Sequence, residues 1–280
     1  MDLISRTKKR GLEKVIIGIL LGVVCLFYLS PIFWLISTAF KEQQHIVSTP
    51  VYFLPPEVTW VHIKNVFRIY GGLKSIKDSL IIASTTMIIC LIVGSFAAYS
   101  LARFKTGGKN LPFWILSNRM LPPIVFVIPF FLLFRRFHLI DTHLGLIFAY
   151  LTFNLPFSVW ILRGFFNQIP KEIDESALID GANRTTVLFR ITLPLAGPGI
   201  VATGLFVFLF SWNEFLYALL LTRGKVRTLP VLIPQLYGGH DILYGEVSAI
   251  TIFAIVPVII LVIFFQRYLV KGLTFGAIEG

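Results

Sequence analysis

The stretch that decides the fold class runs from Val15 to Phe40 and reads VIIGILLGVVCLFYLSPIFWLISTAF. A helix needs about 20 mainly apolar residues to cross the hydrocarbon core of a bilayer, and this run carries no charge. The basic segment Arg6–Arg10 precedes it, as in a secretory signal peptide. The run is too long for a signal peptide, however, and has no small-residue cleavage site. We therefore interpret it as an uncleaved membrane anchor.

Five further stretches have the length and composition of membrane spans. They are Ser79–Ala102, Leu111–Phe134, His143–Phe166, Pro198–Leu221 and Val247–Val270. The fold class expected is therefore an all-α polytopic membrane protein with about six transmembrane helices. The expected organisation is a cytoplasmic N-terminus (1–14), the first span (15–40), an external loop (41–78), a membrane core with five spans (79–271) and a cytoplasmic tail (272–280). A cytoplasmic loop at 167–197 lies inside that core.

Composition supports the membrane assignment. Hydrophobic residues make up 56% of the 280 residues, charged residues only 14%, and the mean hydropathy is +0.82. Such a chain has too few polar residues to cover a soluble core. The net charge of +11 is spread over loops and not gathered on one face, which favours lipid headgroups over nucleic acid as the counter-charge. Cys25 and Cys90 lie in apolar runs, where a thiol is usually a buried hydrophobe, so no metal or disulfide site is expected.

Basic residues indicate the orientation. With six spans, both termini lie on one side. That side, which includes the 103–110 and 163–196 segments, holds 14 of the 25 Lys and Arg residues, against 10 on the other side, with Arg119 assigned to a span. The excess favours cytoplasmic termini.

The loop at 167–197 is charged and patterned. Pro170 suits the first position of a helix, and the acidic residues 172, 174 and 175 suit its positive N-terminal end. Gly181 is a natural stop. After it, apolar residues recur at helical spacing until Pro194 and Pro198 end the pattern. The loop is therefore predicted to be a helix, a glycine turn, a second short helix and a proline break.

At these residues the chain resembles the membrane subunits of binding-protein-dependent ATP-binding-cassette importers. The family pattern is Glu-Ala-Ala, then Gly, then Ile-x-Leu-Pro. The matching positions here are Glu175, Ser176, Ala177, Asp180, Gly181, Ile191, Leu193 and Pro194, with Ser176 in place of the middle Ala. The resemblance implies that the loop couples this chain to an ATPase subunit. Small residues at 176 and 177 for close approach, a tight turn at Gly181 and rigid helical links suit that role. The alternative is an ordinary amphipathic helix at the membrane surface.

The resemblance extends from the first span to the C-terminus and looks like the carbohydrate-uptake branch, specifically the second permease of maltose- and oligosaccharide-type importers. The stretches that carry it are Tyr150–Phe157, Arg163–Phe166, Ser211–Phe215 and Gly272–Ala277. Two departures are Asp78, where the family usually has Asn, and Glu279, where a basic residue is common. The resemblance implies a second homologous permease, two copies of a cytoplasmic ATPase, an extracytoplasmic solute-binding protein and a sugar substrate, in a prokaryotic inner membrane.

The chain has no phosphate-binding loop of its own. The nearest fragment, Thr106–Asn110, lacks both the spacing and the terminal hydroxyl of that motif. ATP and Mg²⁺ are therefore expected on the partner ATPase, with no cofactor on this chain. There is also no nucleophile with a plausible base, so the chain is not expected to be an enzyme.

Polar groups within spans are costly and tend to face a cavity or another helix. The residues that could line a translocation path are Arg119, Asn154, Trp212, Asn213, Glu214 and Phe215. Amide, carboxylate and aromatic groups would suit a polyhydroxyl ligand, and Pro122, Pro123 and Pro156 suggest kinked helices around a path. The alternative is that Asn and Glu only fasten helices together and that Arg119 reaches the membrane surface or pairs structurally.

Two other transport classes remain open on sequence. A secondary transporter also has broken helices and polar groups within its spans, but it usually shows internal repeats, which are absent here. An importer permease for an amino acid, phosphate or polyamine would keep the coupling loop and differ only in its solute. No motif in this sequence identifies the sugar.

Overall fold

The computed structural model describes residues 2–108, 110–237 and 242–274, and the surroundings of side chains from residue 14 to 267 within those ranges. Every regular element in the described part is helical, as predicted from the sequence. The predicted tail at 272–280, including Glu279, lies largely outside the described residues. The chain divides into two compact units, Met1–Gly71 with Leu236–Ile255 and Gly72–Gln235 with Val256–Gly280. We call them the N-terminal unit and the core unit.

The N-terminal unit contains three helices and the first part of a fourth. They are α1 (Asp2–Ala39), α2 (Gln43–Ile46), α3 (Val61–Arg68) and the start of α14 (Tyr244–Thr274). The span Lys14–Ala39 exposes its apolar side chains along its length, as expected for a helix whose solvent is lipid. Cys25 is accordingly exposed, contrary to the prediction of a buried thiol, whereas Cys90 is buried.

A buried polar cluster fastens α3 to the start of α14. His62 Nδ1 lies 3.0 Å from Glu246 Oε2, and Asn65 Nδ2 donates to Glu246 Oε1 at 2.9 Å. The other ring nitrogen of His62 lies 2.9 Å from the carbonyl oxygen of Lys41. Lys41 itself is only 1% exposed and places its ammonium over the ring of Trp34. The predicted external loop is therefore ordered by specific polar contacts.

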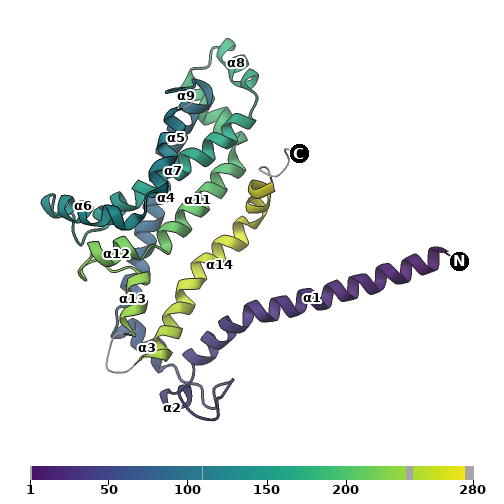
Figure 1. Cartoon of the computed structure of the whole chain (residues 1–280), viewed down its shortest axis with the longest axis vertical. Helices are drawn as coiled ribbons and strands as arrows, with labels where there is room; N and C mark the ends of the chain where they lie inside the picture. Colours follow the sequence, from purple (N-terminus) through teal and green to yellow (C-terminus); the bar gives the residue numbers. More distant parts are fainter. Residues whose placement is uncertain (1, 109, 238–241, 275–280) are drawn as a thin grey trace. The chain divides into compact units, whose positions relative to one another are not determined.

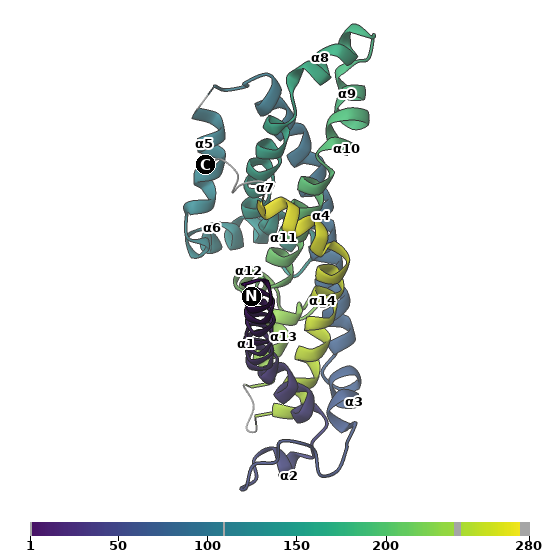
Figure 2. The same cartoon turned by 90° about the vertical axis from the view of Figure 1, so that its right-hand side faces the viewer.

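The core unit contains the remaining elements. They are α4 (Gly72–Arg103), α5 (Asn110–Ser117), η1 (Asn118–Met120), α6 (Pro123–Arg136), α7 (His143–Gln168), α8 (Lys171–Ile179), α9 (Arg184–Val187), the π-helix η2 (Leu188–Thr192), α10 (Leu193–Leu195), α11 (Gly197–Trp212), α12 (Leu216–Leu221), α13 (Leu229–Gln235) and the rest of α14. Figures 1 and 2 show α4, α7 and α11 side by side, with α8 at one end of this bundle and α12 and α13 toward the other.

Small residues bring the bundle helices close together. A Cβ at Gly94 of α4 would lie 3.1 Å from Ser158 Oγ of α7, and one at Gly199 of α11 would overlap the ring of Phe165. Close backbone approach at small residues is the usual way in which helices associate in a membrane, where apolar surface alone gives little driving force. Helix packing at these glycines therefore fixes the frame that holds α8.

The structure confirms the membrane-spanning character and changes two of the six predicted spans. Four helices are long and apolar enough to span alone, and two further pairs qualify only as bent spans. The predicted span Leu111–Phe134 bends by 88° between Met120 and Pro123, because two consecutive prolines cannot continue the hydrogen-bond ladder. The predicted span Pro198–Leu221 is not one helix either, since α11 ends at Trp212 and α12 begins at Leu216.

Candidate functional site

The predicted helix of the 167–197 loop is α8, and the glycine turn predicted after it is present at Gly181. Pro170 is the N-cap and not the first helical residue. Gly181 follows the helix with φ +90°, a conformation that glycine adopts without steric cost. The backbone N–H of Ala182 donates to the Ala177 carbonyl at 3.0 Å, closing the turn.

The predicted coupling residues divide between two faces of α8. Glu175, Ser176, Asp180 and Gly181 are exposed, and so is the neighbouring apolar side chain of Ile179. Ala177 instead packs against its own chain and is buried. Its small size therefore serves the approach of α8 to the bundle, whereas the expectation was close approach to another subunit.

One buried carboxylate joins α8 to the bundle. Arg103 Nε, at the end of α4, donates to Asp174 Oδ2 at 2.7 Å, and Tyr99 Oη donates to the same oxygen at 3.2 Å. Thr192 Oγ1, on η2, donates to Oδ1 at 3.2 Å. We call Asp174 with these three partners the α8 joint. A buried carboxylate satisfied by three donors rigidly links the elements that supply them.

A second contact reinforces the joint. Arg103 Nη1 donates to the carbonyl of Ile169, in the link between α7 and α8, at 3.1 Å. Sequence reasoning gave Asp174 only a helix-dipole role and missed Arg103, Tyr99 and Thr192. The spacing of the sequence could have indicated that Asp174 is buried. Asp174 lies three residues before Ala177 and therefore on the same face of the helix, which is the buried face.

The second half of the loop differs from the prediction that a proline break ends the second short helix. The helical segment Arg184–Leu195 passes through Pro194 and ends at Leu195, and a bend of 80° separates it from α11. The preceding turn is a π-helix, Leu188–Thr192. A π-turn widens the hydrogen-bond ladder, and Pro194 lies in the first turn of α10, where a missing N–H is tolerated.

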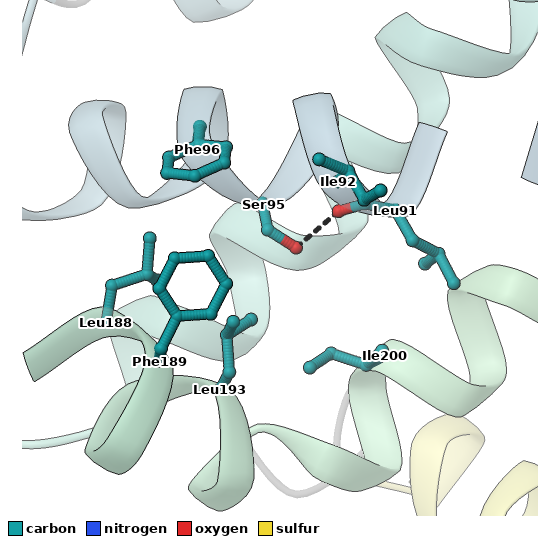
Figure 3. A pocket seen from close by; sticks show the side chains of 8 residues that line it. All are labelled: Leu91, Ile92, Ser95, Phe96, Leu188, Phe189, Leu193 and Ile200. Carbon is teal, nitrogen blue, oxygen red and sulfur yellow. Dashed lines mark hydrogen bonds between the residues drawn. The ribbon is translucent and has the colours of Figure 1, made fainter. Parts of the chain in front are cut away.

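Apolar packing holds this second half against α4. Leu188 is buried in a cluster with Ala98, Tyr99, Leu162 and Phe166, while Ile191 and Leu193 are half-buried and Pro194 is exposed. Figure 3 shows the side chains of Leu188, Phe189 and Leu193 facing Phe96 and Ile92 of α4 across an apolar cavity of about 190 Å³. The 170–194 segment is thus attached to the bundle by both polar and apolar contacts.

Three of the predicted path residues have internal structural roles. Asn154 is fully buried and donates from Nδ2 to Ser211 Oγ of α11 at 3.0 Å. Glu214 accepts from the backbone N–H groups of Tyr217 at 2.9 Å and Ala218 at 3.2 Å, which satisfies the first turn of α12. Trp212 is buried and stacks on Phe208. These contacts are those of the helix-fastening alternative.

The other three predicted path residues are more accessible. Asn213 is exposed and donates to the Leu209 carbonyl at 2.8 Å, and Phe215 is 39% exposed. The guanidinium of Arg119 lies 4.3 Å and 4.6 Å from the ring centroids of Phe157 and Phe210. It lines a cavity of about 260 Å³ together with Asn118 and several aromatic rings. Arg119 therefore contacts the turns of α7 and α11 that lie next to Asn154 and Asn213.

Membrane-length helices, two bent spans and a partly polar cavity beside the break between η1 and α6 are typical of one class, that of membrane transport proteins. A match to a known protein family narrows this class. Residues 90–275 match the model of the "Binding-protein-dependent transport system inner membrane component" family, so the chain belongs to it.

Relatives match over almost the whole chain. The trehalose/maltose transport system permease protein MalG of Thermococcus litoralis is 36% identical over 278 residues, which cover 95% of this chain and 96% of the relative. The trehalose transport system permease protein SugB of Mycobacterium tuberculosis is 35% identical over 260 residues, covering 91% and 93%. The diacetylchitobiose uptake system permease protein DasC of Streptomyces coelicolor is 30% identical and covers 89% and 91%.

A solved structure has the same fold. A chain of a bacterial ABC transporter involved in the import of the acidic polysaccharide alginate superposes with a TM-score of 0.75, covering 93% of this chain and 97% of the other, at 23% identity. The family match and the relatives identify the chain as a transport permease of the inner membrane.

Proposed function

We propose that this chain is the permease subunit of an ATP-driven importer that carries a sugar across the inner membrane, with α8 as the helix that docks on a separate ATPase subunit. Three relatives named for trehalose, maltose or diacetylchitobiose transport support the sugar assignment. The expected partners are a second homologous permease, two ATPase subunits that bind ATP and Mg²⁺, and an external solute-binding protein. Both termini would lie in the cytoplasm, on the side of α8.

The observation that carries the coupling proposal is the α8 joint. A docking helix can move spans only if it is rigidly attached to them. The Asp174 carboxylate receives donors from α4 and from η2, which continues toward α11. The face of α8 opposite this joint exposes Glu175, Ser176 and Ile179. A rigid attachment on one face and an exposed opposite face are what a force-transmitting helix requires.

Two glycine variants test the coupling role. Gly181 has φ +90° and Gly224 has φ +118°, and a Cβ at either would meet nothing within 4 Å. Gly181→Val and Gly224→Val therefore introduce comparable backbone strain, but only the first distorts the turn after α8. The complete transporter would be reconstituted in vesicles, and uptake of maltose, trehalose and diacetylchitobiose would be measured beside ATP hydrolysis.

We expect Gly181→Val to reduce uptake at least tenfold and to abolish the response of ATP hydrolysis to the loaded binding protein, while Gly224→Val keeps both. Normal uptake by Gly181→Val would contradict the coupling role. The sugar assignment is tested separately, because a wild-type transporter that takes up none of these three saccharides and no alginate oligosaccharide would refute it and leave the coupling role intact.

A further inference from the structure

A cavity in the core unit is built from parts of several elements that meet where helices break. Its lining includes Asn118 and Arg119 of η1, Phe126 and Phe130 of α6, Thr152 and Phe153 of α7, and Tyr217 of α12. The bend between η1 and α6 and the gap between α11 and α12 are the two interruptions closest to it in sequence. Interrupted membrane helices are tolerated where they border a cavity.

Aromatic rings form much of the wall. Phe153 and Tyr217 are nearly parallel, with an interplanar angle of 4° and centroids 6.1 Å apart. Phe126 and Phe130 are stacked at 5.8 Å, and the ring of Phe130 lies 6.0 Å from that of Tyr217. Four rings from three helices thus adjoin one another. Flat aromatic faces are suited to the apolar C–H face of a sugar ring.

The same wall carries a cation without a counter-ion. In the described part of the chain no carboxylate lies within ion-pair distance of the Arg119 guanidinium. Its Nη1 is buried and makes no hydrogen bond. Phe157 and Phe210 lie against the guanidinium and restrict its orientation. An unsatisfied charged donor is costly inside a membrane. The Arg119 guanidinium would therefore be stabilised by a polar partner from outside the described chain.

Hydrogen-bond acceptors stand near this cation. Thr152 Oγ1 donates to the Ala149 carbonyl at 2.6 Å, which uses its proton and leaves its oxygen as an acceptor that the Tyr217 side chain also contacts. Asn118 Nδ2 donates to the Trp114 carbonyl at 2.9 Å, so its carbonyl oxygen is the group left to accept. The cavity therefore combines stacking faces, a charged donor and two acceptors.

We propose that this cavity is a saccharide-binding subsite of the translocation path, in which one sugar ring stacks on the aromatic wall and Arg119 donates to an oxygen at its edge. The proposal rests on the sugar-permease function above and adds a contact site on this subunit. The volume of about 260 Å³ lies just below the range of small-molecule sites, which starts at about 300 Å³. It suits a single ring of a longer saccharide.

The first test separates transport from ATP hydrolysis. Phe153→Leu removes a stacking face and keeps an apolar side chain, and Phe113→Leu is the matched control on an exposed Phe of α5. In the reconstituted transporter, with the saccharide that the wild type takes up, we expect Phe153→Leu to lower uptake about tenfold and to change ATP hydrolysis less than twofold. We expect Phe113→Leu to change neither. Uptake by Phe153→Leu within twofold of the wild type would overturn the subsite.

Arg119 variants distinguish a neutral ring from an acidic one. Arg119→Gln keeps a donor and loses the charge, whereas Arg119→Leu loses both. For maltose or trehalose we expect uptake to fall less than threefold with Gln and about tenfold with Leu. For an alginate oligosaccharide, whose carboxylate needs the cation, both variants should lose about a hundredfold. Equal uptake by the wild type and Arg119→Leu with every transported saccharide would count against the proposal, and Arg136→Gln is the control.

A labelling experiment keeps the proposal falsifiable if a variant assembles poorly. Thr152 is exposed, so Thr152→Cys, made with Cys25 and Cys90 changed to Ala, presents a thiol in the cavity. We expect a water-soluble thiol reagent to modify it and the transported saccharide to slow the reaction at least fivefold. A thiol that resists the reagent and is reached only by a lipid-soluble analogue would show that acyl chains fill the cavity. That result would overturn the subsite, and so would a labelling rate that the transported saccharide does not slow.

Failure of wild-type uptake with all four saccharides would instead overturn the sugar assignment.

Discussion

Arg103 and Asp174, 71 residues apart, form a buried ion pair in which Nε lies 2.7 Å from Oδ2 and both side chains are less than a tenth exposed. Removing one partner of such a pair leaves an uncompensated charge and costs about 3–5 kcal/mol. We expect Asp174→Ala to lower the midpoint of thermal denaturation in detergent and to reduce the amount of ATPase that co-purifies with the permease.

A double-mutant cycle isolates the pair. If Arg103 and Asp174 interact directly, the combined loss in Arg103→Ala/Asp174→Ala should be smaller than the sum of the two single losses by about 1–3 kcal/mol. Additive losses would mean that each side chain stabilises the protein through other contacts. Glu175→Ala is the matched control, since the neighbouring carboxylate is exposed and should leave thermal stability unchanged.

The contact of His62 with Glu246 predicts a dependence of stability on pH. The neighbouring Glu246 carboxylate raises the pKa of His62 above its usual value, against the opposing effect of burial. In an unfolded chain a histidine titrates near about 6.5. The charged contact therefore contributes fully below that pH, and its contribution is lost as the pH rises through the higher folded pKa.

We expect the denaturation midpoint of the wild type to fall between pH 6 and pH 8.5 by more than that of His62→Gln. His138→Asn serves as the control, because His138 is exposed and Asn tolerates its positive φ of 54°. An identical pH profile for wild type and His62→Gln would show that the ring does not ionise in this range.

Gly145 lies in the first turn of α7 against a fixed backbone atom. A Cβ there would overlap the carbonyl oxygen of Leu139, which also accepts from Thr142 Oγ1 at 2.7 Å. A backbone oxygen held by a hydrogen bond cannot move aside as a flexible side chain can. Gly145→Ala should therefore destabilise the protein by about 1–3 kcal/mol, measured as a lower midpoint of thermal denaturation.

Gly164, on the same helix, is the control for the intrinsic effect of the substitution. A Cβ there meets nothing within 4 Å, and alanine is the better helix former by about 1 kcal/mol. Gly164→Ala should leave stability unchanged or slightly raised. Equal destabilisation by both variants would assign the effect to the helix as such and not to the contact with Leu139.

The spans could be predicted from sequence because their length and composition are dictated by the bilayer and not by tertiary contacts. The break after Trp212 could not. The segment between Trp212 and Leu216 contains neither Gly nor Pro, and the new helix is stabilised by Glu214, which accepts from two backbone N–H groups of α12. From the sequence, Glu214 could either line a path or fasten helices, and its hydrogen bonds to α12 are of the second kind.

The 170–194 segment could likewise be predicted only in part from the sequence. Its helix and its glycine turn follow from local signals, namely the acidic first turn and the position of Gly181. The α8 joint does not, because it depends on α4 packing beside the loop, and helix packing is set by contacts far apart in sequence. Arg119 was identified by its charge within a span, but the two rings that lie against it come from α7 and α11 and are visible only in three dimensions.

Asp141, between α6 and α7, organises the turn after α12 through its carboxylate. Its Oδ2 accepts from the N–H of Lys225 and its Oδ1 from the N–H of Val226, each at 2.9 Å. Burial would raise the pKa of Asp141, but hydrogen bonds from the backbone N–H groups of residues 223–226 outweigh it and lower the pKa below the usual value. The stabilisation is therefore present above the unfolded pKa of about 3.9 and is lost as the pH falls through the lower folded value.

At neutral pH the charge can be removed by mutation instead. Asp141→Asn keeps the size and tolerates the positive φ of 60°, but an amide oxygen is a weaker acceptor and its NH₂ group cannot accept the second N–H. Leaving a buried donor unpaired costs about 1–3 kcal/mol, and the cost here should be at or below the lower end, because the Lys225 N–H is exposed and the Val226 N–H is partly buried. We expect faster amide exchange of Lys225 and Val226, measured by mass spectrometry of the purified complex, with exchange in α8 unchanged. Unchanged protection at 225 and 226 would show that the turn holds its shape without the carboxylate.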